Sequence, residues 1–405
     1  MKGPFKLAVP LIAALAFAAC SAGGSSNLPI SPDGAPAATH IVPGQMDDAH
    51  PLCTGSRVGQ MQCDALVSNR GPQPDVAGLT AANLEQAYSL PSKKGGKGKS
   101  VYIVDAYDNP DVASDLAAYR SYMGLPVAKF HKYNQEGQTS NYPAGNSDWG
   151  GEIDLDVEMV SASCPNCTIN LVEADDNSNA NLDAAEVEAV KLGGVIVTNS
   201  YSGSGSSESD FDTKGVTYLA SAGDNGYVGG LQQPASFTHV VAVGGTDLTA
   251  DTKSKRGWSE VIWARSGGGC SLTHEAKPAW QTDKGCTYRT GNDISAVAAI
   301  EVAYYDTYQA SGWGLIGGTS VSSPLVAGMY AMAGNATKQT GGENLWKKFT
   351  KLSLKQQEAV TKNNYISVGS SGTCGGTYLC TAGTQQYGIY SGPGGWGTPN
   401  GVKEL

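Results

Sequence analysis

One serine in the last third of the chain is placed as a nucleophile would be. The sequence Gly317-Gly318-Thr319-Ser320 leads into the apolar segment 325–332, which we expect to be a helix. The two glycines permit a tight turn, and Ser320 would lie beside free backbone N–H groups at the positive end of the helix dipole. These groups would stabilise negative charge on an oxygen during acyl transfer. The pattern equally fits an N-capping residue with glycines for turn geometry.

A serine nucleophile needs a base, and the histidines do not supply one. The five histidines stand at positions 40, 50, 131, 239 and 274. The first two lie in a Pro- and Gly-rich N-terminal part, and none of the others has a Gly-rich or helix-opening context. A carboxylate is the alternative base.

Acidic residues stand among apolar ones in the segment 149–160. As a helix, this segment places Glu152 and Asp156 one turn apart on one face, beside an apolar stripe. As a strand, it would crowd Glu152, Asp154 and Asp156 on one face, where like charges repel. We therefore predict a helix, and a solvated acidic helix face is the alternative to a catalytic role.

Short apolar strands alternate with helical patterns through the middle of the chain. The expected strands are 100–104, 168–172, 195–198, 216–220 and 240–243, and the expected helices are 111–123 and 181–192. This alternation predicts an α/β fold, with a mostly parallel sheet and helices on both faces. Ligands of such sheets bind beyond the carboxyl ends of the strands, and Asp224 stands there in a Gly-flanked turn after the strand 216–220.

Composition and charge limit the function classes. The chain has 405 residues with 53 glycines and only 16% charged residues, which is typical of a globular protein with many tight turns. The net charge of −10 argues against nucleic acid and anionic membrane surfaces as partners.

The N-terminus has the pattern of an export signal. Lys2 and Lys6 precede the apolar run 7–19, which is too short to span a bilayer and ends in small residues. Cys20 follows at once, as in a bacterial lipoprotein signal, and cleavage near Ala18 without a lipid is the alternative. The predicted organisation is a signal over 1–20, a flexible leader or short pro-segment over 21–77, and a folded domain over 78–405.

The other eight cysteines also favour export, because they fall into pairs of sequence neighbours that suit disulfides. The predicted disulfides are Cys53–Cys63, Cys164–Cys167, Cys270–Cys286 and Cys374–Cys380. A zinc site at Cys164 and Cys167 is disfavoured, since no further ligands with metal-binding spacing accompany them.

The combined motifs resemble the sedolisins, or serine-carboxyl peptidases. The resemblance covers about residues 79–401. The motifs that carry it are Glu152-x-x-x-Asp156, Ser221-Ala222-Gly223-Asp224-Asn225-Gly226, Gly244-Gly245-Thr246, Ser266-Gly267-Gly268-Gly269, Asp293-Ile294-Ser295-Ala296-Val297 and Gly317-Gly318-Thr319-Ser320. The His-Gly-Thr motif of the subtilisins proper is absent. The resemblance implies a subtilisin-like three-layer fold and endopeptidase activity.

The resemblance also implies a role for each matching residue. Ser320 matches the nucleophile, Glu152 the general base, Asp156 the acid that orients Glu152, and Asp224 the acid that donates to the oxyanion. The residues Ser200-Tyr201-Ser202-Gly203 look like the edge that pairs with an extended substrate. A carboxylate base has an ordinary pKa of ~4, and an aspartate donates only while protonated, so we expect an acidic working pH.

Two departures from the family pattern concern calcium and the pro-domain. The family usually builds a C-terminal calcium site from aspartates, whereas Tyr365 and the segment 390–395 stand at those places here. We therefore expect no metal and no cofactor. The stretch 21–77 is also shorter than the family's pro-domains, which argues against autoinhibition and acid-triggered maturation.

We thus predict an exported, monomeric endopeptidase that cleaves proteins or peptides at acidic pH through a Ser320 acyl-enzyme. One alternative uses Asp105, which follows the first strand where a subtilisin-type triad keeps its aspartate, in place of Glu152. The other alternative is a non-catalytic peptide-binding surface protein that retains the fold.

Overall fold

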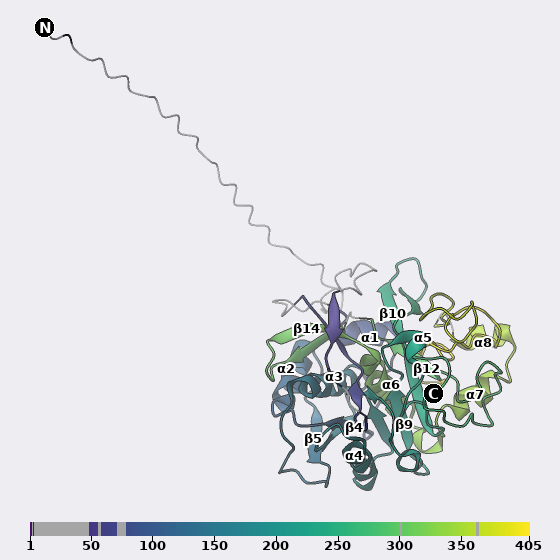
Figure 1. Ribbon diagram of the computed structural model, residues 1–405, viewed down its shortest axis with the longest axis horizontal. Helices are drawn as coiled ribbons and strands as arrows, with labels where there is room; N and C mark the ends of the chain where they lie inside the picture. Colours follow the sequence, from purple (N-terminus) through teal and green to yellow (C-terminus); the bar gives the residue numbers. More distant parts are fainter. Residues whose placement is uncertain (2, 4–47, 56–57, 71–77, 300–301, 362–363) are drawn as a thin grey trace. The chain divides into compact units, whose positions relative to one another are not determined.

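The computed structural model describes Met1, Gly3 and residues 48–55, 58–70, 78–299, 302–361 and 364–405. The spatial order of its main sheet is β11 (Trp258–Ile262), β10 (Val240–Ala250), β9 (Thr217–Ser221), β7 (Ile196–Asn199), β4 (Ser100–Ala106), β6 (Thr168–Ala174) and β5 (Lys129–Asn134), and β12 (Ile294–Val297) also pairs with β10 (Figure 1). Every pairing in this sheet is parallel except that of β10 with β11. The predicted α/β class with a mostly parallel sheet is confirmed.

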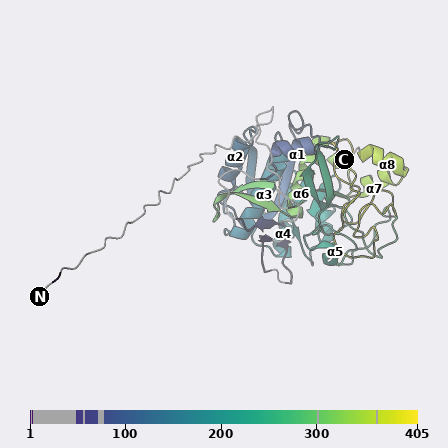
Figure 2. The same cartoon turned by 90° about the horizontal axis from the view of Figure 1, so that it is seen from above.

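Helices cover both faces of this sheet, because alternate side chains of each strand point to opposite faces. The helices are α1 (Ala81–Ala87), α2 (Val112–Tyr122), α3 (Ser147–Ser163) and α6 (Thr319–Ala333) on one side, and α4 (Asn179–Lys191) on the other (Figures 1 and 2). In β4, Val101 and Ile103 share a core with α3 and α6, whereas Tyr102 and Val104 share a core with α4. The predicted three layers are therefore present.

Two smaller antiparallel sheets join the N-terminal part to the domain. The first has the order β1 (Ala49–Pro51), β3 (Leu66–Ser68), β14 (Gly312–Gly317) and β13 (Val302–Asp306), and the second pairs β2 (Gln62–Cys63) with β8 (Tyr201–Ser202). The prediction of a flexible leader over 21–77 is therefore wrong for 48–55 and 58–70. Local composition missed this order because β2 and β3 pair with β8 and β14, which lie more than a hundred residues away. The alternative of a short pro-segment stays a prediction.

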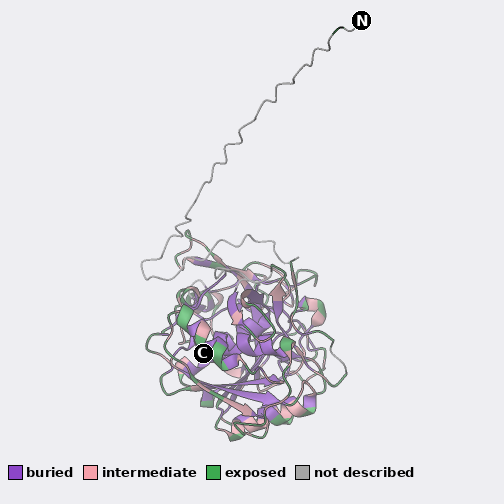
Figure 3. Ribbon diagram, turned by 90° about the vertical axis from the view of Figure 1, so that its left-hand side faces the viewer, coloured by how far each residue is buried: buried purple, intermediate pink, exposed green. Residues whose placement is uncertain are grey.

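The C-terminal part consists mainly of loops around short helices. The helices here and in the preceding loops are η2 (Glu208–Phe211), α5 (Gly226–Gly229), η3 (Ala336–Lys338), α7 (Glu343–Phe349) and α8 (Leu354–Thr361). Aromatic side chains hold the C-terminal loops on α7, since Trp396 lies against both Trp346 and Phe349 with ring centroids 5.2 and 5.0 Å apart. Figure 3 shows the buried residues gathered on the sheet and on the helices that face it.

All four predicted disulfides are present, between Cys53 and Cys63, Cys164 and Cys167, Cys270 and Cys286, and Cys374 and Cys380. The predicted signal and Cys20 lie outside the described residues, apart from Met1 and Gly3. Among the helices that the structure describes, none has the length and apolar character needed to cross a membrane.

Candidate active site

Ser320 is buried in the first turn of α6, directly after a turn that favours glycine. Gly318 has a φ of 106°, and a Cβ at this position would overlap the carbonyl oxygen of Asp64. The Ser320 N–H donates to that oxygen at 3.1 Å, and the Ser320 hydroxyl donates to the carbonyl oxygen of Ser200 at 3.2 Å. Gly318 is the N-cap residue of α6, so the interpretation of Ser320 as a cap is wrong.

The helix α3 brings two acids toward Ser320, because α3 packs directly against α6. It begins after the capping residue Asn146, and residues 149–163 are all buried, so the predicted helix is confirmed and the solvated acidic face is ruled out. The hydroxyl of Ser200 donates to Asp156 Oδ1 at 2.8 Å. Ser200 therefore links the carboxyl group of Asp156 to the hydroxyl of Ser320.

Three buried carboxyl groups interact electrostatically beside Ser320. Burial raises the pKa of Glu152 well above its usual value, the charges of Asp156 and Asp105 raise it further, and the Ser320 hydroxyl opposes them. Burial and the charge of Asp105 likewise raise the pKa of Asp156, while Ser200 and Glu152 lower it. At the end of β4, burial raises the pKa of Asp105 to about 8. At a pH where isolated carboxyl groups are ionised, the three groups together therefore carry less negative charge than three isolated carboxylates would.

Asp224 lies just after β9 and contacts the first turn of α6. Its Oδ1 accepts hydrogen bonds from the Thr319 backbone N–H at 2.8 Å and from the Thr319 hydroxyl at 2.9 Å. Its buried Oδ2 has no hydrogen-bond partner among the described residues and lies beside Gly318. Burial raises the pKa of Asp224 to about 7, against the lowering effects of Thr319 and of the Arg265 charge. When protonated, this carboxyl group can donate to an oxygen that also accepts from the Ser320 N–H.

The residues predicted as a substrate-binding edge, 200–203, lie next to Ser320 and are covered by the chain's own N-terminal part. Tyr201 and Ser202 form β8, which pairs with β2, and the Asp64 N–H donates to the Ser200 carbonyl oxygen at 3.1 Å. Sequence reasoning missed Asp64, which is buried against this edge. No local signal marks it, since its position depends on the pairing of β2 with β8.

The residues that stand in place of the family's calcium ligands have aromatic or partly exposed surroundings. The ring of Tyr390 lies 4.6 Å from that of Trp346 and 5.2 Å from that of Trp396, measured between centroids. Tyr365 is partly exposed. The absence of calcium from this region stays a prediction.

A different group of acids has the spacing that a metal ion would need. Asp115 of α2, Asp154 of α3 and Asp306 of β13 each place one carboxylate oxygen within 4.8 Å of the others. Thr307 donates its backbone N–H to Asp115 at 2.8 Å, and the Asn109 amide donates to Asp154 at 2.7 Å. These acids either share protons or hold a cation.

We expect shared protons in this group to make the protein more stable in acid. The pKa of Asp306 is raised to about 6, and the pKa of Asp154 is raised well above its usual value. Burial is the main cause in both cases. Carboxyl groups whose pKa is raised by folding stabilise the folded state below their unfolded pKa of ~4, and this stability is lost as the pH rises through the folded pKa. The melting temperature should therefore fall between pH 4 and pH 7.

The substitution Asp154→Asn should make this fall shallower, because it removes one of the groups that must ionise. Glu136→Gln, at an exposed position, is the matched control and should leave the fall unchanged. Scanning calorimetry over this range measures the effect. A melting temperature that instead rises with pH and drops on addition of a chelator would contradict shared protons and indicate a bound cation.

The fold and the site together define a subtilisin-like α/β protein whose buried serine is surrounded by carboxyl groups. Residues 134–382 match the Peptidase S8 model, which describes the subtilase family. The chain belongs to the subtilase family, and within it to the sedolisin group.

Individual relatives agree with this assignment. The chain is 28% identical to kumamolisin of Bacillus sp. (strain MN-32) over 293 residues, which cover 62% of this chain and 51% of kumamolisin. It is 27% identical to sedolisin of Pseudomonas sp. (strain 101) over 353 residues, which cover 77% of this chain and 58% of sedolisin. The chain thus spans little more than half the length of these two relatives.

One solved structure supports the fold. It is Pseudomonas sedolisin, a serine-carboxyl proteinase complexed with two molecules of pseudo-iodotyrostatin, which superposes with a TM-score of 0.64 at 23% identity. The match covers 80% of this chain and 96% of that chain. The predicted subtilisin-like fold is confirmed.

Proposed function

We propose that this protein is an exported serine-carboxyl endopeptidase that hydrolyses protein or peptide substrates at acidic pH. The observation that carries the proposal is the burial of Glu152, Asp156 and Asp224 around Ser320, with no histidine among the residues that line the adjacent cleft. The family assignment and the four disulfides support the peptidase class and export, respectively.

In the proposed reaction, Ser320 Oγ attacks the substrate carbonyl carbon while its proton passes to the carboxylate of Glu152. Asp156 holds Glu152 in place and stabilises it by sharing a proton. The oxyanion accepts hydrogen bonds from the Ser320 N–H and from protonated Asp224. The peptide C–N bond then breaks, and the proton from Glu152 passes to the leaving amine. Water attacks the acyl-enzyme by the same route and regenerates Ser320.

The pH dependence of kcat/KM tests this mechanism. Asp224 donates only while protonated, and burial raises its pKa to about 7, so activity should be lost as the pH rises through about 7. An amide donates at any pH. Asp224→Asn should therefore lower the maximum rate but remove most of the loss above neutral pH. A pH–rate profile on a quenched-fluorescence peptide pool measures both enzymes.

The outcomes discriminate among the candidate functions. If the Asp224→Asn variant lost kcat/KM above neutral pH in the same way as the wild type, this result would contradict the oxyanion role of Asp224. Complete absence of turnover from pH 3 to pH 8 in the intact protein would refute the peptidase proposal and leave the peptide-binding alternative.

A further inference from the structure

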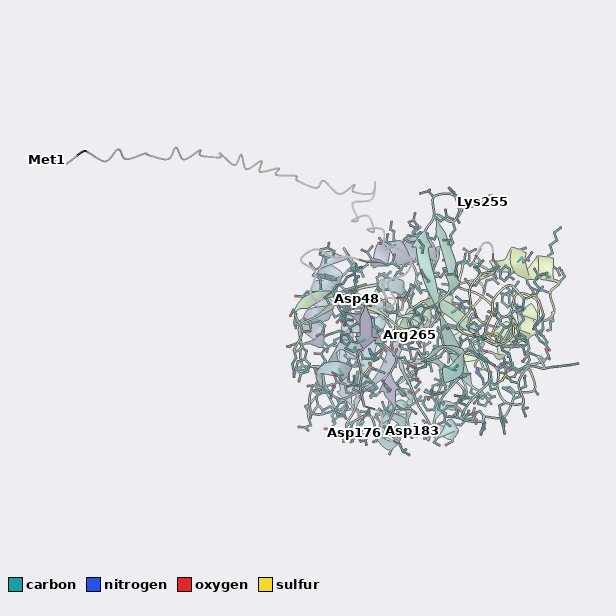
Figure 4. The ribbon with its side chains drawn as sticks, turned by 45° about the horizontal axis from the view of Figure 1, so that its top comes forward. Met1, Asp48, Asp176, Asp183, Lys255 and Arg265 are labelled. Carbon is teal, nitrogen blue, oxygen red and sulfur yellow. A yellow bond between two sulfur atoms is a disulfide. The ribbon has the colours of Figure 1, made fainter. Side chains whose placement is uncertain are left out.

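The loop that follows β11 forms one wall of the cleft beside Ser320 and brings a cation to it. Arg265 of this loop lines the cleft together with Asp224 and the residues 202–204. It is the only basic residue among the described residues that line this cleft. Figure 4 labels Arg265 on the body of the domain and Lys255 at the tip of the hairpin between β10 and β11. Arg265 thus gives the cleft a positive charge beside the proposed oxyanion donor.

The side chain of Arg265 is held against the turn that carries Asp224. Its Nε donates to the Asp224 carbonyl oxygen at 3.0 Å, and its own carbonyl oxygen accepts the Gly226 N–H at 2.8 Å. Two residues further on, the Gly267 N–H donates to the Gly223 carbonyl oxygen at 2.7 Å. A Cβ on Gly267 would overlap backbone oxygens of this turn, so glycine permits the close approach. One end of the guanidinium group is therefore fixed beside Asp224.

The outer end of the Arg265 guanidinium group is unpaired. Within the described part of the chain, neither Nη nitrogen has a hydrogen-bond or ion-pair partner, and the residue is partly exposed. The two Nη nitrogens carry four N–H groups in one plane, and this arrangement matches the two oxygens of a carboxylate. A carboxylate is therefore the group that Arg265 can bind most specifically.

The acids that line the same cleft, Asp64 and Asp224, offset the charge of Arg265 only weakly in acid. Burial raises the pKa of Asp224 to about 7, although Thr319 and the charge of Arg265 lower it. Burial and the charge of Asp224 raise the pKa of Asp64 well above its usual value. Near pH 5 the two carboxyl groups together therefore carry less negative charge than two isolated carboxylates would. The positive charge of Arg265 is thus left to attract an anionic group of a ligand.

The path of the chain past Ser320 shows which part of a substrate would meet Arg265. The Ser320 N–H donates to the Asp64 carbonyl oxygen at 3.1 Å, and two residues later Leu66 packs with Trp263 in one hydrophobic cluster. A substrate whose carbonyl group accepts the same N–H, and that runs in the same direction, places the residues after its cleaved bond against the loop of Trp263 and Arg265. Arg265 therefore faces the leaving-group side of the cleft.

We propose that Arg265 binds a carboxylate of the substrate on the leaving-group side, so that peptides with this group among the first three residues after the cleaved bond are preferred. The proposal rests on the peptidase function proposed above and names its substrate class. The carboxylate belongs either to an Asp or Glu side chain or to the C-terminal end of the substrate. Its two oxygens accept N–H groups of the guanidinium fork. This contact forms when the substrate binds, so it should lower KM more than it raises kcat.

The first experiment measures kcat/KM at pH 5 for amidated peptides that differ only at one of the three positions after the cleaved bond. At this pH a substrate aspartate is ionised, whereas Asp224 is protonated. At one of these positions, Asp should give at least about tenfold faster cleavage than Asn, and Lys should be slower than Asn. A second set compares free and amidated C-terminal ends at the same positions, and mass spectrometry identifies the cleaved bond. This set distinguishes a chain end from a side chain as the source of the carboxylate.

The second experiment repeats the comparison with variants of Arg265. Arg265→Gln should reduce the preference for the carboxylate to within about twofold, mainly through a higher KM for the peptide that carries it. Arg265→Lys keeps the charge without the fork and should retain part of the preference, whereas Arg265→Glu should favour the Lys peptide over the Asp peptide. Lys255→Gln is the matched control, since it removes an exposed basic residue outside the cleft lining, and it should keep the full preference.

The outcomes separate this inference from the proposed function. If Arg265 only held the turn of Asp224, Arg265→Gln would lower kcat/KM for all peptides equally and leave the preference unchanged, which would overturn the inference. Equal cleavage of the Asp, Asn and Lys peptides by the wild type, with no preference for a free C-terminal end, would also overturn it and leave the proposed function standing. Absence of cleavage of every peptide would overturn the proposed function itself.

Discussion

Ser320→Ala should lower kcat/KM on peptide substrates by about 10⁴-fold or more, because no acyl-enzyme can form without the hydroxyl group. Ser320 is buried in the first turn of α6, which packs against α3, and its backbone N–H would remain to bind the oxyanion. The variant should therefore still bind peptides. Steady-state kinetics at pH 4, together with a binding measurement on the same peptide, separates the loss of chemistry from a loss of binding.

Ser322→Ala is the matched control. Ser322 lies in the same turn of α6 and is equally buried, but its hydroxyl donates to the carbonyl oxygens of Ala296 and Val297. This change should cost about 1 kcal/mol of stability and leave activity within a fewfold of wild type. If Ser320→Ala kept most of its activity, or if both variants lost activity equally, Ser320 would not be the nucleophile.

Glu152→Gln should lower kcat/KM by about 10³-fold, because an amide cannot accept the proton of Ser320. Asp105→Asn should cost less than about tenfold. The pH–rate profiles of both variants on one peptide give the comparison.

The alternative in which Asp105 serves the serine predicts the reverse order of effects. Under that alternative, Asp105→Asn would nearly abolish turnover while Glu152→Gln would retain most of it. Circular dichroism at the assay pH is needed for both variants, since each removes a buried carboxyl group. A folded Glu152→Gln variant with near-normal kcat/KM would refute the proposed base.

The elements around the site were predictable because their patterns are local. The segment 149–160 was predicted to be a helix because a strand would crowd its acidic side chains on one face, where they repel each other. The structure has α3 in this segment. The motif Gly317–Ser320 predicted where α6 begins, because the turn before the helix needs a positive φ at Gly318, which glycine favours. Neighbouring cysteines likewise gave the four disulfides.

The parts that were missed depend on contacts between distant segments. The strand β14 pairs with β13 on one side and, on the other, with β3, which lies more than two hundred residues earlier in the chain. The composition of 21–77 resembles a loop, and its strands β2 and β3 pair with the distant strands β8 and β14. The protonation of Asp105 and Asp156 also depends on burial, which no local pattern reveals.

The disulfide between Cys53 and Cys63 lies wholly before Asp64. None of the disulfides in the described part of the chain joins the two sides of the bond between Asp64 and Ala65. A single cut at this bond would therefore leave two pieces that nothing covalent connects. Anything carried upstream, a lipid on Cys20 included, would stay with the shorter piece. After such a cut, only noncovalent contacts, such as the pairing of β2 with β8, would hold the shorter piece on the domain that carries Ser320.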